Sequence, residues 1–537
     1  MISLPSLIIF LAYFTSNLSQ IKQEERKNSR FGLLHKSSIT AVITLLLFNT
    51  LFASDRNLMK QVMFGWDFVG HFGIFRWGLN NLELYTSQNT QSSNYIESYL
   101  DSNYPQTWAL WGANFFRLMP QENFLIMKAL LVFSIFTLLV AYLIFTKTSI
   151  ECWDELKTRT TDSVEVKFKK KTAQQNLYVI SFYIVIISFI AFCWNTNCPH
   201  FALSTSLIFR VTLLSLVEKN SIHNDIEKTF CLLVAFILYP LTMIFSGLYI
   251  YTYLRRKFVN FSNSNLKINL IDFATNISIL CTALGIVLIK PDKGISLETL
   301  IFSYGGVTFP SFVLVIVMII IICLGVYSKI SRTQIIQVVF LSLPLIILSL
   351  LLIVRNGELS YYGAKSTIAF ATLLIGFYSC VSLDSKGGTF TPLKMFIALF
   401  CVLSALLLVK DKVSPIFDDV NKRGVPMLFL RVLNSYELPR NWEPAENVVA
   451  EIYKMDKDSN YKPIFTSGNP YLANMWLAMI GRYPKEIFEG TGNLISGQLP
   501  IVLDYSNPIA FISRNLETEQ IDSFKKEFPY ITVVPKD

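Results

Sequence analysis

NFLIMKALLVFSIFTLLVAYLIFT, residues 123–146, is an almost uninterrupted apolar run whose one charge is Lys128. A helix needs about 20 apolar residues to cross the roughly 30 Å hydrocarbon layer of a bilayer, and this run is long enough. Similar runs flank it at 38–53, 177–194, 230–254, 269–289, 309–327, 334–354, 366–383 and 392–409, with a shorter one at 1–14. The pattern predicts an all-α polytopic membrane bundle over residues 1–410.

Composition agrees with a membrane protein. Apolar residues make up 52% of the chain and charged residues only 16%, against about 25% charged in soluble domains. The formal net charge of +9 comes mainly from loops between the apolar runs, around 22–36, 147–171 and 255–267. Such loop bias orients membrane proteins, so no nucleic-acid partner is expected. The eight cysteines show no CxxC spacing, which predicts neither a metal cluster nor a disulfide framework.

One apolar run conflicts with a simple topology. Phe201–Val217 carries Arg210 at its centre, and an arginine at mid-bilayer costs about 2.5–3.5 kcal/mol on insertion scales. If this run crossed the bilayer, the later basic residues at 255–257, 329–332 and 386 would all face outward, against the loop bias. We therefore expect 195–229 to be an outer loop with an amphipathic interfacial helix. Ten transmembrane helices in a cell (plasma) membrane remain. The regions 54–122, 195–229, 290–308, 355–365 and the tail then lie outside.

The tail, residues 411–537, has mixed charge and more Pro and Gly than the apolar region. Pro444 marks a helix start, followed by the apolar stripe of Val448, Val449 and Ile452. Short strands are predicted at 463–466, 500–504, 509–513 and 530–534, and helices at 471–480 and 517–528. Alternating strands and helices predict a small extracytoplasmic α/β domain.

The first outer loop, 54–122, holds the clearest candidate chemistry. Asp67 and His71 are four residues apart, which on a helix places both on one face. A carboxylate beside an imidazole suits removal of a proton from a hydroxyl. The aromatic faces of Trp66, Tyr104 and Trp108 suit a sugar ring or lipid. The alternative, equally weighted on these residues alone, is that Asp67 caps a helix and the aromatics anchor it at the interface.

A second cluster lies at 355–365, on the same predicted side. Arg355 and Lys365 suit a lipid phosphate, with Tyr361 and Tyr362 beside them. The alternative is that both cations snorkel to headgroups. His200, in the outer segment 195–200, is a further candidate, although the ordinary reading of a single loop histidine is favoured there.

Three elements together resemble the GT-C superfamily of polytopic glycosyltransferases: Trp-Asp-x-x-x-His at 66–71, Tyr-Pro-x-x-Trp at 104–108 and Tyr-Tyr-x-x-Lys at 361–365. The likeness is to members that use polyprenyl-phosphate-linked sugars, including arabinofuranosyltransferase-like proteins. It implies transfer of the sugar to an extracytoplasmic glycan or lipid-linked acceptor in cell-envelope (cell wall) biogenesis. It assigns Asp67 as base, His71 as the group that orients Asp67 or the acceptor, and Lys365, Arg355 and Arg76 as ligands of the donor phosphate.

The chain departs from that family in two respects. Two apolar runs precede the first outer loop, where the family has one. Asp67 is followed by Phe68 and Val69 rather than by a second acid, so no paired-acid motif supports a divalent metal, and no cofactor is predicted. Asp101 and Glu97 in the same loop are the candidates for a second carboxylate.

Two other functions were weighed against glycosyl transfer. A transporter or lipid flippase typically keeps ionisable residues at mid-depth and shows internal repeats, whereas these runs are nearly free of acids, with Asp272 near one end. If the chain is a non-catalytic scaffold with a binding tail, the clustering of Asp67, His71, Arg355 and Lys365 on one predicted side is a coincidence.

Overall fold

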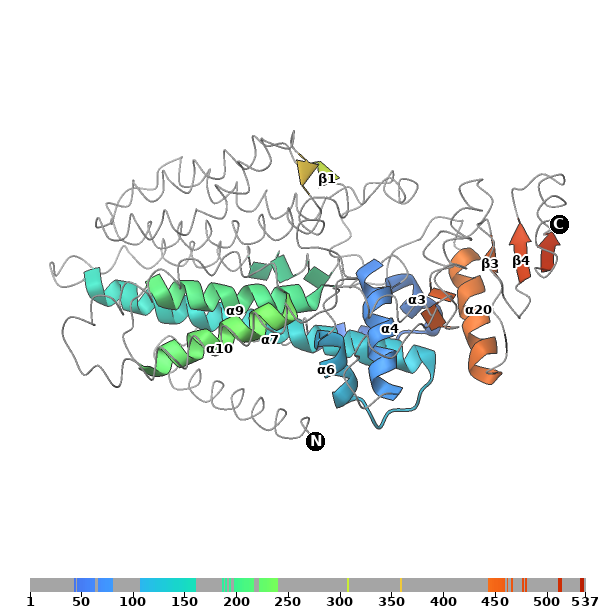
Figure 1. Ribbon diagram of the computed structural model, residues 1–537, viewed down its shortest axis with the longest axis horizontal. Helices are drawn as coiled ribbons and strands as arrows, with labels where there is room; N and C mark the ends of the chain where they lie inside the picture. The colour runs from blue at the N-terminus through green and yellow to red at the C-terminus, as the bar shows by residue number, and fades with distance from the viewer. Residues whose placement is uncertain are drawn as a thin grey trace, which may run out of the picture. The chain divides into compact units, whose positions relative to one another are not determined.

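The computed structural model is predominantly helical in the part of the chain that it describes (Figure 1). It describes residues 43–44, 46–62, 66–80, 107–160, 186–187, 189–190, 193–194, 198–216, 222–239, 307–308, 358–359, 443–458, 461, 465–466, 476–477, 479–480, 510–513 and 532–535. The chain divides into two compact units, one of Met1–Phe136 with Phe429–Asp537 and one of Thr137–Leu428.

The first unit contains three helices of residues 54–122, the predicted first outer loop. These are α3 (Asp55–Val62), α4 (Trp66–Asn80) and α6 (Thr107–Phe115). The Ser54 hydroxyl accepts a hydrogen bond from the Asn57 amide at 3.3 Å, which caps the start of α3, while Asp55 in its first turn complements the helix dipole. Helices α4 and α6 pack closely because Gly78 of α4 lacks a side chain where Ala113 approaches, and Gly112 of α6 lacks one where Phe75 of α4 approaches.

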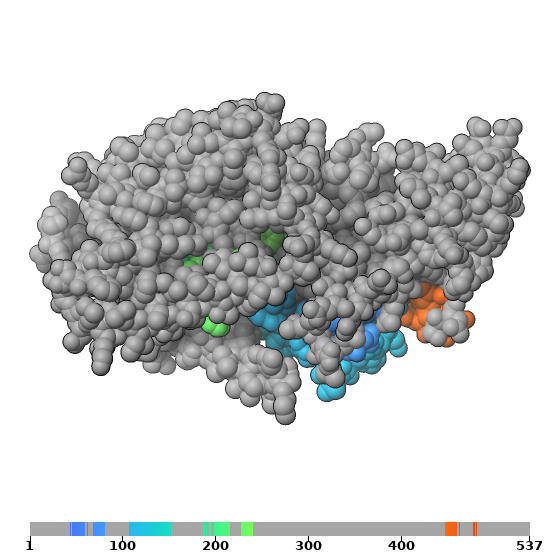
Figure 2. Space-filling view, in the orientation of Figure 1, coloured from blue at the N-terminus to red at the C-terminus, as the bar shows by residue number. Residues whose placement is uncertain are grey.

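The first unit also contains α20 (Glu443–Lys457), which packs on α3. Val448 and Ile452 of α20 are fully buried, which confirms the predicted apolar stripe. The Tyr453 hydroxyl donates a hydrogen bond to Asp55, and Arg56 forms an ion pair with Glu446. Part of α20 reaches the surface on the face seen in Figure 2. Tyr453 of this helix is 45% exposed.

Three short strands form a parallel sheet in the order β3–β4–β5. They are β3 (Phe465–Thr466), β4 (Ala510–Ser513) and β5 (Thr532–Pro535). Each overlaps a predicted strand. The predicted strand at 500–504 and helix at 517–528 lie outside the described residues, so the α/β layer as a whole stays a prediction.

The second unit contains the later part of α7 (Asn123–Thr160), α9 (Pro199–Leu216) and α10 (Ile222–Leu238). It also holds an antiparallel pair of β1 (Val307–Thr308) and β2 (Glu358–Leu359). Helices α9 and α10 are antiparallel, since the start of α9 contacts the end of α10. Phe201 lies at a ring distance of 5.0 Å from Tyr239, and the Ser204 hydroxyl donates a hydrogen bond to the Ala235 carbonyl at 2.7 Å.

Among the described residues, helix α7 contains a candidate membrane span. Its segment Asn123–Ser149 is 27 residues long and contains an 18-residue window with a mean hydropathy of 2.5, so it is long and apolar enough to cross a bilayer. Elsewhere in the described residues, no second helix meets the same criteria. Membrane association is thus supported by one helix, and the bundle of ten spans stays a prediction.

Candidate functional site

The predicted Asp67–His71 pair lies in one helix. Asp67 is in the first turn of α4, and His71 follows one turn later. The helical spacing expected from the sequence is therefore confirmed. The side chains of Trp66 and Asp67 lie outside the described residues, whereas the His71 side chain is fully buried.

The structure brings His71 and Trp108 together, although they are distant in sequence. Their ring centroids are 4.9 Å apart in an edge-to-face arrangement, a geometry that aromatic pairs favour. The Trp108 indole also stacks on Phe133 at 5.3 Å and is only 1% exposed. Two predicted site residues thus share one buried aromatic cluster formed by α4, α6 and α7, in which the ring of Trp108 is packed on protein.

Arg76 faces the C-terminal tail. Its Nη1 atom donates a hydrogen bond to the carbonyl oxygen of Ile480 at 2.6 Å. Its positive charge also acts on the Asp456 carboxyl. Asp456 accepts a hydrogen bond from the Asn123 side chain, yet burial of this carboxyl outweighs both attractions and raises its pKa above the ordinary value.

The C-terminal tail also covers α4, which sequence reasoning missed. Trp476 is fully buried, with ring distances of 6.0 Å to Phe68 and 5.1 Å to Phe72. Met479 lies against Gly73, at the position where a larger residue would place its Cβ atom. The only sequence signal for this contact was the apolar helical pattern of 471–480, and nothing in that pattern identified α4 as the partner.

Of the remaining predicted site residues, the structure describes His200. His200 belongs to the second unit, where it is 2% exposed and its ring lies 5.8 Å from Tyr239. The other members of the predicted site lie outside the described residues: Tyr104, Arg355, Tyr361, Tyr362 and Lys365.

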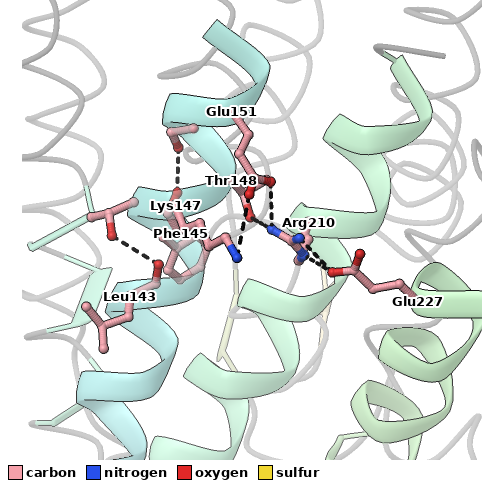
Figure 3. Close-up of polar contacts among 9 residues, drawn as sticks. Leu143, Phe145, Lys147, Thr148, Glu151, Arg210 and Glu227 are labelled. Atoms are coloured by element: carbon pink, nitrogen blue, oxygen red, sulfur yellow. Dashed lines mark hydrogen bonds and ion pairs between the residues drawn. The ribbon is translucent and has the colours of Figure 1, made fainter. Parts of the chain in front are cut away.

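A second cluster, in the second unit, surrounds Arg210 (Figure 3). The Arg210 Nε atom donates to Glu227 at 2.7 Å, and Nη1 donates to Thr148 at 3.2 Å and to Glu151 at 3.1 Å. Lys147 lies 3.6 Å from Glu151. Arg210 is 5% exposed, so its charge is buried against two carboxylates contributed by α7 and α10. We name these residues the Arg210 cluster.

The Arg210 cluster corrects one sequence argument. The insertion cost of about 2.5–3.5 kcal/mol applies to an arginine without a partner. In the structure, carboxylates on neighbouring helices neutralise Arg210. The polar residues Ser204, Thr205 and Ser206 of α9 are buried as well. Arg210 is therefore no reason to keep 201–217 out of the membrane. The location of 195–229 as an outer interfacial loop stays a prediction.

No group of three or more His, Cys, Asp or Glu side chains capable of holding a metal occurs within the described ranges.

No protein-family model, curated protein or solved structure matches this chain.

Proposed function

We propose that the chain is a multi-pass membrane glycosyltransferase that moves a sugar from a polyprenyl-phosphate donor to an extracytoplasmic glycan or lipid-linked acceptor. One observation carries the proposal: α4 holds Asp67 and His71 one turn apart, and α6 brings Trp108 against His71. The resemblance in motifs supplies the reaction, and this convergence of its first two motifs supports it.

In the proposed reaction, Asp67 takes the proton from an acceptor hydroxyl. The hydroxyl oxygen then bonds to the anomeric carbon of the sugar, while the bond between that carbon and the phosphate oxygen breaks. Polyprenyl phosphate leaves with the bonding electrons. Such a leaving group needs cations rather than a protein acid, and Arg355 and Lys365 are assigned that role. Arg76 is assigned a structural role instead, because its guanidinium binds the Ile480 carbonyl.

The proposed topology differs from the predicted one at α9 and α10. From Asn123 to Glu151, α7 rises by about 42 Å at 1.5 Å per residue, more than the roughly 30 Å hydrocarbon layer. If the loop before Asn123 lies outside, Glu151 lies at the cytoplasmic end. Arg210 donates a hydrogen bond to Glu151, which supports placing Arg210 at the same depth in the bilayer, near the cytoplasmic end.

Helix α9 then enters from the outer side at Pro199, and antiparallel α10 returns. The orientation of later segments is unchanged only if 241–254 also crosses, and as a helix its 14 residues would rise about 21 Å, less than the roughly 30 Å hydrocarbon layer. The basic residues at 255–257 then remain cytoplasmic, as the loop bias requires. The pairing of β1 with β2 supports one common side for the predicted outer loops 290–308 and 355–365.

A cysteine placed at position 219, between α9 and α10, tests this topology. In intact cells of a cysteine-free variant, Lys219→Cys should resist a membrane-impermeant maleimide and react only after permeabilisation. Asn195→Cys is the control, because position 195 is outside in both topologies. Labelling of Lys219→Cys in intact cells would overturn this topology and favour an outer, interfacial location for 195–229.

The function is tested with membranes containing the full chain and a panel of polyprenyl-phosphate pentoses and hexoses labelled in the sugar. Wild type should release label from the lipid into an acceptor, and Asp67→Asn should abolish release. Asp55→Asn is the matched control: it removes a carboxylate of the same loop whose partners are Tyr453 and Lys128. Asp55→Asn should retain transfer. Absence of transfer by wild type, or full transfer by Asp67→Asn, overturns the proposal.

One observation favours the transporter alternative. The Arg210 cluster places ionisable groups among apolar helices, where they often mark ion or substrate paths. Its charges neutralise one another, however, which is equally consistent with a structural role in holding the helices together. If Asp67→Asn moves labelled lipid across sealed vesicles as fast as wild type, and neither protein transfers the sugar, the transporter is the correct function.

A further inference from the structure

The helix that carries the proposed base is held from two sides. On one side, His71 meets Trp108 of α6, and a Cβ atom at Gly78 would lie 2.9 Å from Ala113. On the other side, Phe68 and Phe72 meet Trp476 of the tail. Residues 71 and 78 lie two turns apart on one face. Phe72, Gly73 and Arg76, which contact the tail, lie further around the helix. Helix α4 is therefore packed between α6 and the tail.

The tail contact lies next to the proposed base. Phe68 directly follows Asp67 and is 1% exposed, and Trp476 is fully buried beside it. One turn further along α4, Met479 fills the space above Gly73. At the next turn, Arg76 holds the Ile480 carbonyl at 2.6 Å. Contacts over consecutive turns of one helix fix both its rotation and its displacement along its axis.

We propose that Trp476 is a positioning residue for Asp67: through Phe68 and Phe72 it sets the rotation of α4, and hence where the base meets the acceptor hydroxyl. This rests on the proposed function. The reason is geometric, because proton transfer needs the base within hydrogen-bonding distance of the hydroxyl, and a misplacement of about 1 Å can cost on the order of 100-fold in rate.

The chemistry of Trp476 allows a conservative substitution. Its Nε1 atom is buried and makes no hydrogen bond within the described part of the chain. Its contacts with α4 are therefore made by the ring face and edge, which phenylalanine can largely reproduce. Trp476→Phe should keep the packing on Phe68 and Phe72, whereas Trp476→Ala removes it.

The test measures kcat and KM for donor turnover by the full chain in membranes, with the labelled polyprenyl-phosphate sugar that wild type uses. Trp476→Ala should lower kcat at least tenfold with KM within twofold of wild type, and Trp476→Phe should recover kcat to within threefold. Leu477→Ala is the matched control, because Leu477 is the equally buried neighbour. It should lower kcat less than threefold. A kcat for Trp476→Ala within threefold of wild type overturns the proposal.

Hydrogen exchange of α4 supplies a readout independent of activity. Trp476→Ala should speed exchange of the backbone amides of 68–76, and Leu477→Ala should leave them close to wild type. Faster exchange without any sugar transfer by wild type means that the positioning contact exists and the proposed function is wrong. Unchanged exchange in α4 overturns the positioning role, whatever the activity.

Discussion

The Arg76 side chain donates a hydrogen bond to the main-chain carbonyl of Ile480 across 404 positions of sequence. This bond, with the contacts of Trp476 on Phe68 and Phe72, joins the beginning and the end of the chain in one compact unit. The tail is consequently part of the structure that surrounds α4. We expect changes in the tail to alter the candidate site directly.

The Arg210 cluster should be a major source of stability. Arg210→Met leaves Glu151 and Glu227 without their shared cation, and breaking a buried pair from one side typically costs about 3–5 kcal/mol. Arg210→Lys should cost less, because it keeps the charge but loses the planar fork that reaches Glu227, Thr148 and Glu151 at once. Thermal unfolding in detergent measures both.

The control for that series is Lys147→Gln, since Lys147 lies 3.6 Å from Glu151, farther than the 3.1 Å between Arg210 and Glu151. It should shift the midpoint much less than Arg210→Met. Equal midpoints for wild type and Arg210→Met would mean that the cluster contributes no net stability.

Gly112 should tolerate a methyl group less well than Gly73. A Cβ atom at Gly112 would lie 2.7 Å from the Phe133 ring and 2.9 Å from the Phe75 ring, both of them rigid, whereas at Gly73 it would meet the flexible end of Met479. Overpacking of this kind costs about 1–3 kcal/mol, so Gly112→Ala should lie in that range and Gly73→Ala below it. The opposite order of thermal midpoints would contradict the packing described for α4 and α6.

Asp456→Asn should change stability in a pH-dependent way. Burial raises the pKa of the Asp456 carboxyl above 3.8 in the folded chain, so the folded state favours its protonated form. The associated stability is present below the unfolded pKa and is lost as pH rises through the folded pKa. Asparagine stays neutral and keeps an acceptor for Asn123. Asp456→Asn should therefore raise the thermal midpoint near pH 7 and leave it unchanged near pH 3.

Wild type and Asp456→Asn are compared at both pH values in the same detergent. An increase that is larger at pH 3 than at pH 7 would mean that the pKa of the Asp456 carboxyl is not raised in the folded chain.

The ion pair between Arg56 and Glu446 offers a charge-swap test of how α20 packs on α3. Both side chains are about half exposed, so the pair is worth at most about 1 kcal/mol. Glu446→Arg should lower the midpoint slightly, through repulsion of Arg56, and the double swap Arg56→Glu with Glu446→Arg should restore it. A double variant no better than Glu446→Arg would show that these two side chains do not interact.

Local structure was largely predictable from the sequence. The spacing of Asp67 and His71 predicted a helix, and both lie in α4. The stripe of Val448 and Ile452 predicted the buried face of α20. Three of the predicted strands overlap β3, β4 and β5. Each of these follows from side-chain periodicity, which is a property of a few neighbouring residues.

The partners of these elements required the tertiary structure. Arg210 looked like an obstacle to burial because its sequence neighbours carry no acid to neutralise it, and its carboxylates come from positions 59 and 17 residues away, on other helices. Trp476 and Ile480 likewise meet α4 only because the chain returns to its beginning. Periodicity shows which face of a helix is apolar, but packing between distant segments decides what covers that face, and no local pattern encodes that choice.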